Sequence, residues 1–182
     1  SACLVRRFGL VPAGARRAAY GALLDEQPAA LRRLASVFAA SALLAERVIA
    51  HPLLLDELLI DRGQELPPSR EQIEAEMARR LGAVHEPDLE REVDLLQEQR
   101  LAVQFHVGLA FLGGRIDAVA AARSLTDVAE AVLATALRIA ERDLIAAHGR
   151  MDDRPGDGTA MAVIGYGSLG GMELGFWSDR DL

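Results

Sequence analysis

Two features able to do chemistry lie near the C-terminal end of the chain, a glycine-rich stretch and a pair of aspartates. The apolar residues 161–164 run directly into Gly165-Tyr166-Gly167-Ser168, a pattern typical of a buried strand that ends in a tight turn. Glycines let the backbone approach phosphate oxygens closely, and a serine adds a hydroxyl and a backbone N–H. We therefore predict that Gly167 and Ser168 bind phosphate groups of a nucleotide, and that a helix starts near Leu169.

The second feature is the pair Asp179 and Asp181, which ten residues separate from Ser168. Their i, i+2 spacing places both side chains on the same face of an extended segment. Two carboxylates on one face repel each other unless a cation lies between them, and hard oxygen ligands favour Mg²⁺ or Mn²⁺ over softer metals. We therefore predict that Asp179 and Asp181 are metal ligands.

Taken in this order, the two features resemble the signature of the polymerase-β-like nucleotidyltransferase superfamily. The longer string Gly165 to Leu174, followed by Ser178 to Leu182, is similar to the glutamine synthetase adenylyltransferase family, as is the upstream segment at residues 51–59. The chain departs from that family's pattern at Ser168, where a lysine is usual, and at Arg180, where an apolar residue is usual.

The resemblance implies a bacterial enzyme that transfers AMP from ATP to a tyrosine of glutamine synthetase and so regulates nitrogen assimilation. In such an enzyme Asp179 and Asp181 are catalytic and hold Mg²⁺ or Mn²⁺, and the PII signal protein is a regulatory partner. Members carry two nucleotidyltransferase domains, and Tyr166 makes this copy more similar to the adenylylating C-terminal one. Superfamily members also need a third carboxylate on a later strand, so we expect this chain alone to have little or no transferase activity.

Two alternatives remain open from the sequence. The same motif also fits the deadenylylating domain of the family, which removes AMP from glutamine synthetase by phosphorolysis. The helices could instead form a non-catalytic module that receives signals from PII or glutamine. A second copy of the glycine and aspartate motif before or after this one in the full gene would distinguish the first two readings.

Composition limits the remaining function classes. The chain has 182 residues, is 51% hydrophobic but only 4% aromatic, and carries a formal net charge of −7. An acidic chain without an uninterrupted basic stripe is not expected to bind nucleic acid. The single cysteine, Cys3, suits a reducing cytoplasm, and no apolar run is long enough to predict a membrane span.

Helical periodicity dominates the chain up to about residue 150. We predict a mainly α chain, with a multi-helix bundle over residues 1–150 and a linker over residues 151–158. Residues 159–182 are then the first strand-turn-strand piece of an α/β nucleotidyltransferase domain, which is truncated here. Ser69 with Gln72 predicts a capping box, and Ser124 with Asp127 predicts the cap of the last long helix. The expected helices span residues 28–50, 52–60, 69–81, 87–112 and 124–148.

Overall fold

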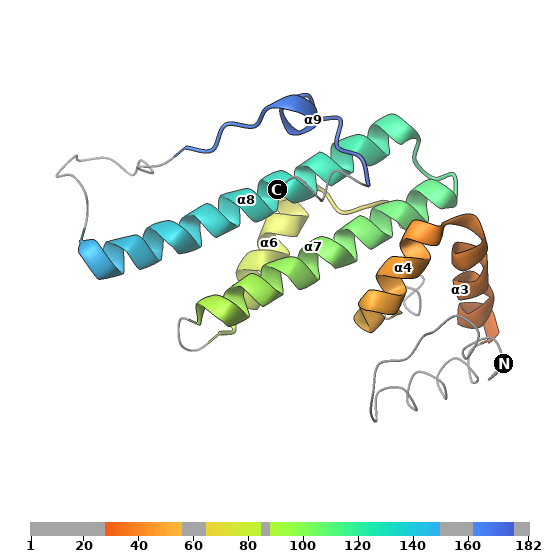
Figure 1. Ribbon diagram of the computed structural model, residues 1–182, viewed down its shortest axis with the longest axis horizontal. Coiled ribbons are helices and arrows are strands. Elements are labelled where there is room, and N and C mark those ends of the chain that lie inside the picture. The colour runs from red at the N-terminus through yellow and green to blue at the C-terminus, as the bar shows by residue number, and fades with distance from the viewer. Residues whose placement is uncertain (1–27, 56–64, 85–87, 150–161, 177–182) are drawn as a thin grey trace. The chain divides into compact units, whose positions relative to one another are not determined.

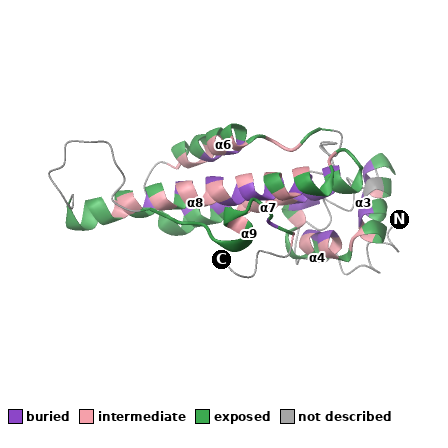
Figure 2. Ribbon diagram, turned by 90° about the horizontal axis from the view of Figure 1, so that it is seen from above, coloured by how far each residue is buried: buried purple, intermediate pink, exposed green. Residues whose placement is uncertain are grey.

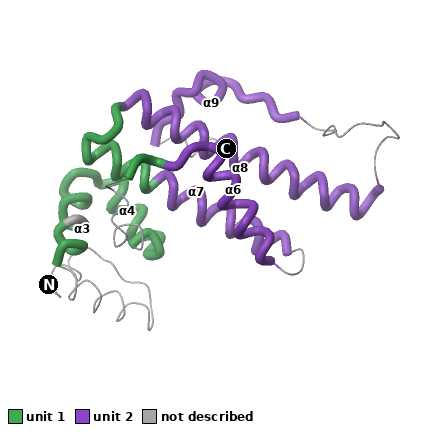
Figure 3. Tube along the Cα trace, turned by 180° about the vertical axis from the view of Figure 1, so that it is seen from behind, with its two compact units in different colours: residues 1–67, 105–117 green, residues 68–104, 118–182 purple. Residues whose placement is uncertain are grey.

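The computed structural model describes residues 28–55, 65–84, 88–149 and 162–176, which are mainly helical (Figure 1). The chain divides into two compact units (Figure 3). The first unit comprises residues 1–67 and 105–117, and the second comprises residues 68–104 and 118–182. The predicted linker over residues 151–158 lies outside the described residues.

In the first unit, two short helices replace the single helix expected over residues 28–50. Helix α3 spans Pro28–Ala40, helix α4 spans Ala42–Ala50, and the two pack against each other. The break falls at Ser41, whose backbone is extended and whose side chain accepts a hydrogen bond from the Leu44 N–H at 3.3 Å. Ser41 therefore acts as an N-cap, so the apolar repeat continues across the break while the helical backbone does not.

Helix α4 ends before Pro52, as predicted, and the short 3-10 helix η1 follows over Pro52–Leu54. The helix expected to continue to residue 60 runs into residues outside the described part. Within the same unit, Gly108 lies against α4, because a Cβ atom added at Gly108 would come within 2.9 Å of Leu44 Cδ2. A glycine in the middle of a helix is explained here by this close approach.

In the second unit, helix α6 spans Arg70–Gly82 and begins with the capping box predicted from the sequence. The Ser69 side chain accepts a hydrogen bond from the Gln72 N–H, and the Gln72 side chain accepts one from the Ser69 N–H at 2.8 Å. Two N–H groups that a helix start would otherwise leave unpaired are satisfied in this way. Local sequence alone fixes where α6 begins.

Replacing Ser69 by alanine is expected to lower the free energy of unfolding by about 1 kcal/mol, because it removes the N-cap acceptor of α6. Urea unfolding of the chain followed by circular dichroism measures the effect. The matched control is Ser36→Ala in the middle of α3, where the hydroxyl donates to the Arg32 carbonyl at 2.9 Å and caps nothing. Equal losses in the two variants would contradict a capping role for Ser69.

Helix α7 spans Leu89–Leu112, close to the predicted bounds, and its residues up to Gln104 belong to the second unit. The predicted glycine stop is confirmed, because Gly114 adopts a left-handed backbone with φ of 66°. The N–H of Arg115 then donates to the Ala110 carbonyl at 2.9 Å and closes the helix end. Such a left-handed residue just after a helix is strongly favoured as glycine.

Helix α8 spans Ala118–His148, so it begins six residues before the predicted start at Ser124. Residues 118–123 are mostly alanine, the strongest helix former, and Asp117 just before them is a favoured N-cap type. The proposed cap at Ser124 and Asp127 is therefore wrong, and both residues lie inside the helix. The predicted end near His148 is confirmed, with Gly149 following in a left-handed conformation at φ of 75°.

The core of the second unit forms where α6 packs against α8. Ile73 and Met77 of α6 are each 1% exposed, and Val128 of α8 is fully buried. The Thr135 hydroxyl donates to the Met77 sulfur at 3.8 Å, which joins residues 58 positions apart in the sequence. Figure 2 shows buried residues recurring along α7 and α8 with exposed positions between them, as amphipathic helices require.

Three ion pairs join helices of the second unit in the described residues, and one of them links Arg80 of α6 to Glu98 of α7 at 4.0 Å. The Arg142 guanidinium of α8 donates two hydrogen bonds to the Glu92 carboxylate of α7, at 2.6 and 2.7 Å. Glu92 is only 4% exposed, and this pairing, together with Asp143, raises the pKa of Arg142 further above its ordinary value. Arg70 of α6 is bonded to Glu74 in the next turn and to Glu130 of α8.

The predicted strand over residues 161–164 is not found in its described part, residues 162–164, and no strand occurs elsewhere in the described residues. Val163 is 57% exposed and Ile164 is 70% exposed. A strand needs a neighbouring strand for its backbone hydrogen bonds, and the described residues offer none. The mainly α assignment is thus confirmed, whereas the strand-turn-strand piece stays a prediction. None of the described helices is long and apolar enough to cross a membrane.

Candidate functional site

The glycine-rich segment predicted to bind phosphate folds into a single tight turn. Helix α9 comprises only Gly167–Gly170, and Tyr166 precedes it with an extended backbone (Figure 1). Gly167 adopts φ of 60°, a left-handed conformation that favours glycine. Gly167 and Ser168, the two residues predicted to contact phosphates, thus lie together at the start of this turn, and both are exposed.

The helix expected to start at Leu169 does not continue, because a Schellman motif ends α9 after one turn. The N–H of Glu173 donates to the Ser168 carbonyl at 2.8 Å, and the N–H of Met172 donates to the Leu169 carbonyl at 3.2 Å. Met172 takes the left-handed position of this motif, with φ of 57°, where glycine is usual. The sequence contains no signal for this stop, since methionine rarely adopts that conformation.

The hydrogen bonds within the turn use the backbone N–H groups at its end but not those at its beginning. The N–H groups of Gly170, Gly171, Met172 and Glu173 all donate to carbonyls within the turn. In the described part of the chain, no hydrogen bond uses the N–H groups of Gly167, Ser168 and Leu169. Together with the exposed Ser168 hydroxyl, these three amides present a cluster of donors that suits an anion such as a phosphate.

Gly170 has a different role from Gly167, because it is required by close packing of the backbone. A Cβ atom added at Gly170 would lie 2.5 Å from the Gly165 carbonyl oxygen, a distance that no side chain tolerates. The approach of Gly170 to Gly165 folds the turn back onto the segment before it. The sequence predicted a close approach of phosphate oxygens to these glycines, and the contact of Gly170 with Gly165 is a separate feature that was not predicted.

The two predicted metal ligands, Asp179 and Asp181, lie outside the described residues. Among the residues that are described, no group of three or more His, Cys, Asp or Glu side chains is arranged to hold a metal ion. The structure therefore describes the turn that contains Gly167 and Ser168, and their binding of phosphate stays a prediction. The metal half of the predicted site also remains a prediction that rests on the chemistry of two carboxylates, whose hard oxygens suit Mg²⁺ or Mn²⁺.

Known proteins resemble almost the whole chain and not only its glycine-rich segment. The family model for glutamate-ammonia ligase adenylyltransferase matches residues 31–182. Over 181 residues the chain is 49% identical to the bifunctional glutamine synthetase adenylyltransferase/adenylyl-removing enzyme of Xanthomonas axonopodis pv. citri, and the match covers 100% of the chain and 18% of that protein.

Two further relatives carry the same name. The Stenotrophomonas maltophilia (strain R551-3) protein is 50% identical over 181 residues, covering 100% of the chain and 19% of the relative. The Pseudomonas putida protein is 40% identical over 183 residues, covering 98% of the chain and 18% of the relative. The chain thus spans about a fifth of the length of the curated relatives that it matches. With the family model covering residues 31–182, the chain belongs to the glutamate-ammonia ligase adenylyltransferase family.

Proposed function

We infer that this chain contributes the phosphate-binding turn and the first two catalytic carboxylates of an enzyme that transfers AMP from ATP to a tyrosine of glutamine synthetase. The observation that carries the proposal is the exposed donor cluster at Gly167, Ser168 and Leu169, placed ten residues before Asp179. The adenylylating activity is favoured over phosphorolytic removal by Tyr166, through its resemblance to the adenylylating copy of the motif. We also propose a cytoplasmic location and PII as the regulatory partner.

In the proposed reaction the tyrosine oxygen attacks the α-phosphorus of ATP, and the bond from that phosphorus to the bridging oxygen of pyrophosphate breaks. The N–H groups at the start of α9 and the Ser168 hydroxyl bind the β- and γ-phosphates and hold the leaving group in line. Asp179 and Asp181 would hold the Mg²⁺ or Mn²⁺ ion. When bound, the Mg²⁺ or Mn²⁺ ion neutralises charge on the phosphates and activates the attacking hydroxyl.

The direct test is AMP incorporation into glutamine synthetase by the full-length protein, measured with ATP labelled at its α-phosphate. We expect label on a glutamine synthetase tyrosine. Incubation of adenylylated glutamine synthetase with inorganic phosphate, followed by measurement of ADP, tests the phosphorolytic alternative in parallel. A protein that forms ADP from adenylylated glutamine synthetase but never incorporates label would contradict the proposal.

The 182-residue chain by itself is expected to incorporate little or no AMP, because the third carboxylate of the superfamily is predicted to come from a later strand. The same labelling assay measures this, with the full-length protein as positive control. Robust labelling by the chain alone would show that the first two carboxylates suffice, which would overturn the predicted division of the active site.

Replacing Gly170 by alanine is expected to reduce AMP incorporation by the full-length protein by about a hundredfold, because the added Cβ pushes the turn away from Gly165 and displaces Ser168. The matched control is Gly82→Ala at the end of α6, where an added Cβ meets nothing within 4 Å. If Gly170→Ala retained normal activity, the turn could not be the phosphate-binding element.

A further inference from the structure

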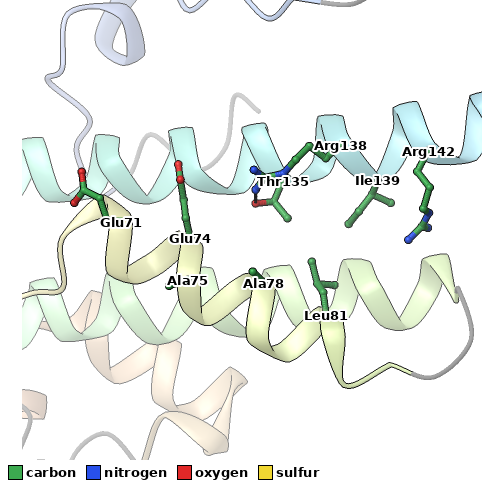
Figure 4. A pocket seen from close by; sticks show the side chains of 9 residues that line it. All are labelled: Glu71, Glu74, Ala75, Ala78, Leu81, Thr135, Arg138, Ile139 and Arg142. Atoms are coloured by element: carbon green, nitrogen blue, oxygen red, sulfur yellow. Dashed lines mark hydrogen bonds between the residues drawn. The ribbon is translucent and has the colours of Figure 1, made fainter. Parts of the chain in front are cut away.

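The second unit contains a groove between α6 and α8 that the proposed reaction does not use. It has a volume of about 520 Å³, and Figure 4 shows its lining side chains. Ala75, Ala78 and Leu81 of α6 and Ile139 of α8 supply apolar walls. Ala75 and Ala78 are exposed, so the groove is open to solvent along the α6 side.

The spacing of the wall residues follows the helical repeat on both sides. Glu71, Glu74, Ala78 and Leu81 lie one turn apart along α6, and Thr135, Arg138 and Arg142 lie one turn apart along α8. Met77, by contrast, is 1% exposed and belongs to the core beneath. Ala75 and Ala78 of α6 are therefore exposed beside the core, whereas Thr135 and Ile139 of α8 line the groove and are themselves buried, at 3% and 7% exposed.

The walls select a helix as the occupant over an extended peptide. One way in which an extended peptide gains affinity is to pair its backbone with the open edge of a sheet, and no strand occurs in the described residues. The backbone groups of α6 and α8 are used within those helices. A docked helix satisfies its own backbone, and the small side chains of Ala75 and Ala78 let it approach α6 closely.

One end of the groove is acidic. Glu71 and Glu74 line it there, as Figure 4 shows, with Arg142 at the other end. Arg70 is already bonded to Glu74 and Glu130, so it cannot neutralise all the carboxylates near it. The pKa of the nearby Asp127 is raised, first by burial and then by the charge of Glu130.

The opposite end carries less net charge. The Arg142 guanidinium is held by the buried Glu92 carboxylate and by Asp143 at 2.7 Å, so its charge is compensated within the unit. The Arg138 guanidinium, which also lines the groove, donates to the Thr135 hydroxyl at 2.9 Å. Charge complementarity thus places the basic residues of an occupant at the Glu71 and Glu74 end.

We propose that the groove between α6 and α8 is a docking site for an amphipathic helix of a partner protein. The apolar face of that helix covers Ala75, Ala78 and Leu81, and basic side chains at one of its ends lie against Glu71 and Glu74. The site is independent of the phosphate-binding turn, so it does not depend on which reaction the full-length protein performs.

The probe is a synthetic helical peptide of about 18 residues, with leucines every three or four positions and lysines confined to one end. Its binding to the 182-residue chain is measured by fluorescence anisotropy at low and at physiological salt. We expect saturable binding that weakens as salt rises, and none by the same peptide with glutamates in place of the lysines. No binding of the lysine peptide, or equal binding of both peptides, would overturn the proposal.

Two pairs of variants locate the peptide. Glu71→Lys is expected to weaken binding about tenfold or more, whereas Glu90→Lys leaves it unchanged within about twofold. Both glutamates are exposed and are the second residue of their helix, but Glu90 is on α7, outside the groove. Equal weakening by both variants would mean non-specific attraction to an acidic chain, and would contradict the site.

The second pair tests the shape of the groove. Ala78→Phe fills it and is expected to weaken binding about tenfold or more, whereas Ala136→Phe on the exposed surface of α8 has no effect. Circular dichroism confirms that both variants fold. Sedimentation of the unliganded chain identifies the competing occupant, because self-association that Ala78→Phe abolishes would assign the groove to a second copy and overturn the partner proposal.

Discussion

Replacing Asp179 or Asp181 by asparagine is expected to lower AMP incorporation by the full-length protein by about a thousandfold or more. In the proposed reaction each carboxylate would supply a charged oxygen to the metal that neutralises the phosphates, and losing one such ligand would remove several kcal/mol of transition-state stabilisation. Asparagine keeps the shape of the side chain and removes its charge. The measurement is the labelling of glutamine synthetase with α-labelled ATP.

The matched control is Asp94→Asn on the exposed side of α7, which makes the same chemical change away from the proposed site and should leave activity unchanged. Removal of AMP from glutamine synthetase, measured in the same proteins, is expected to survive in the Asp179 and Asp181 variants. Loss of AMP removal with retained incorporation would assign this motif to the deadenylylating domain instead.

Replacing Arg142 by methionine is expected to cost about 3–5 kcal/mol of stability, whereas replacing Glu92 by leucine costs far less. The two side chains differ in exposure, with 42% for Arg142 and 5% for Glu92. Without Arg142, the Glu92 carboxylate is left buried and unpaired. Without Glu92, the Arg142 guanidinium still reaches solvent and keeps its bond to Asp143 at 2.7 Å.

Urea unfolding of the four proteins in this double-mutant cycle measures the asymmetry. The double variant Glu92→Leu with Arg142→Met should recover most of the lost stability, because it no longer leaves a buried carboxylate without its partner. A cost for Glu92→Leu as large as that for Arg142→Met would show that the pair stabilises the fold by its attraction. A larger cost for Arg142→Met than for Glu92→Leu would show that the lost stability comes from leaving the Glu92 carboxylate unpaired.

Helix bounds that depend on short-range chemistry could be predicted from the sequence. The capping box of Ser69 and Gln72 involves residues three apart, so its hydrogen bonds form wherever the chain starts a helix there. The stop at Gly113 and Gly114 is equally local, because a glycine can adopt the left-handed conformation of a helix end at little cost.

Prediction from local capping signals failed for serine, because a serine can either cap a helix or lie inside one. Ser124 was predicted to start α8 but lies within it, whereas Ser41 starts α4 within a predicted helix. A hydroxyl inside a helix can bond to the carbonyl four residues earlier, as Thr126 does with the Ala122 carbonyl at 2.9 Å. Whether such a hydroxyl caps a helix or lies inside one depends on how the surrounding apolar residues pack. A local sequence pattern carries no information about that packing.

The partners of helices and the shape of the glycine turn could not be predicted at all. Periodicity indicates that Ile73 and Met77 are buried, but it does not say that α8 covers them. In the turn, the glycines indicated backbone freedom, yet the left-handed Met172 that ends α9 has no sequence signal. Long-range packing determines the pairing of α6 with α8, whereas hydrogen bonds within the turn hold Met172 in its conformation.

The pairing of α6 with α8 also has a consequence for synthesis on the ribosome. Thr135, which bonds to Met77, is made 58 residues later. At translation rates of about 5–20 residues per second, about 3–12 seconds pass between the synthesis of Met77 and that of Thr135. Throughout that interval Ile73 and Met77 have no α8 to cover them, so the nascent chain presents an apolar helix face that a chaperone can recognise.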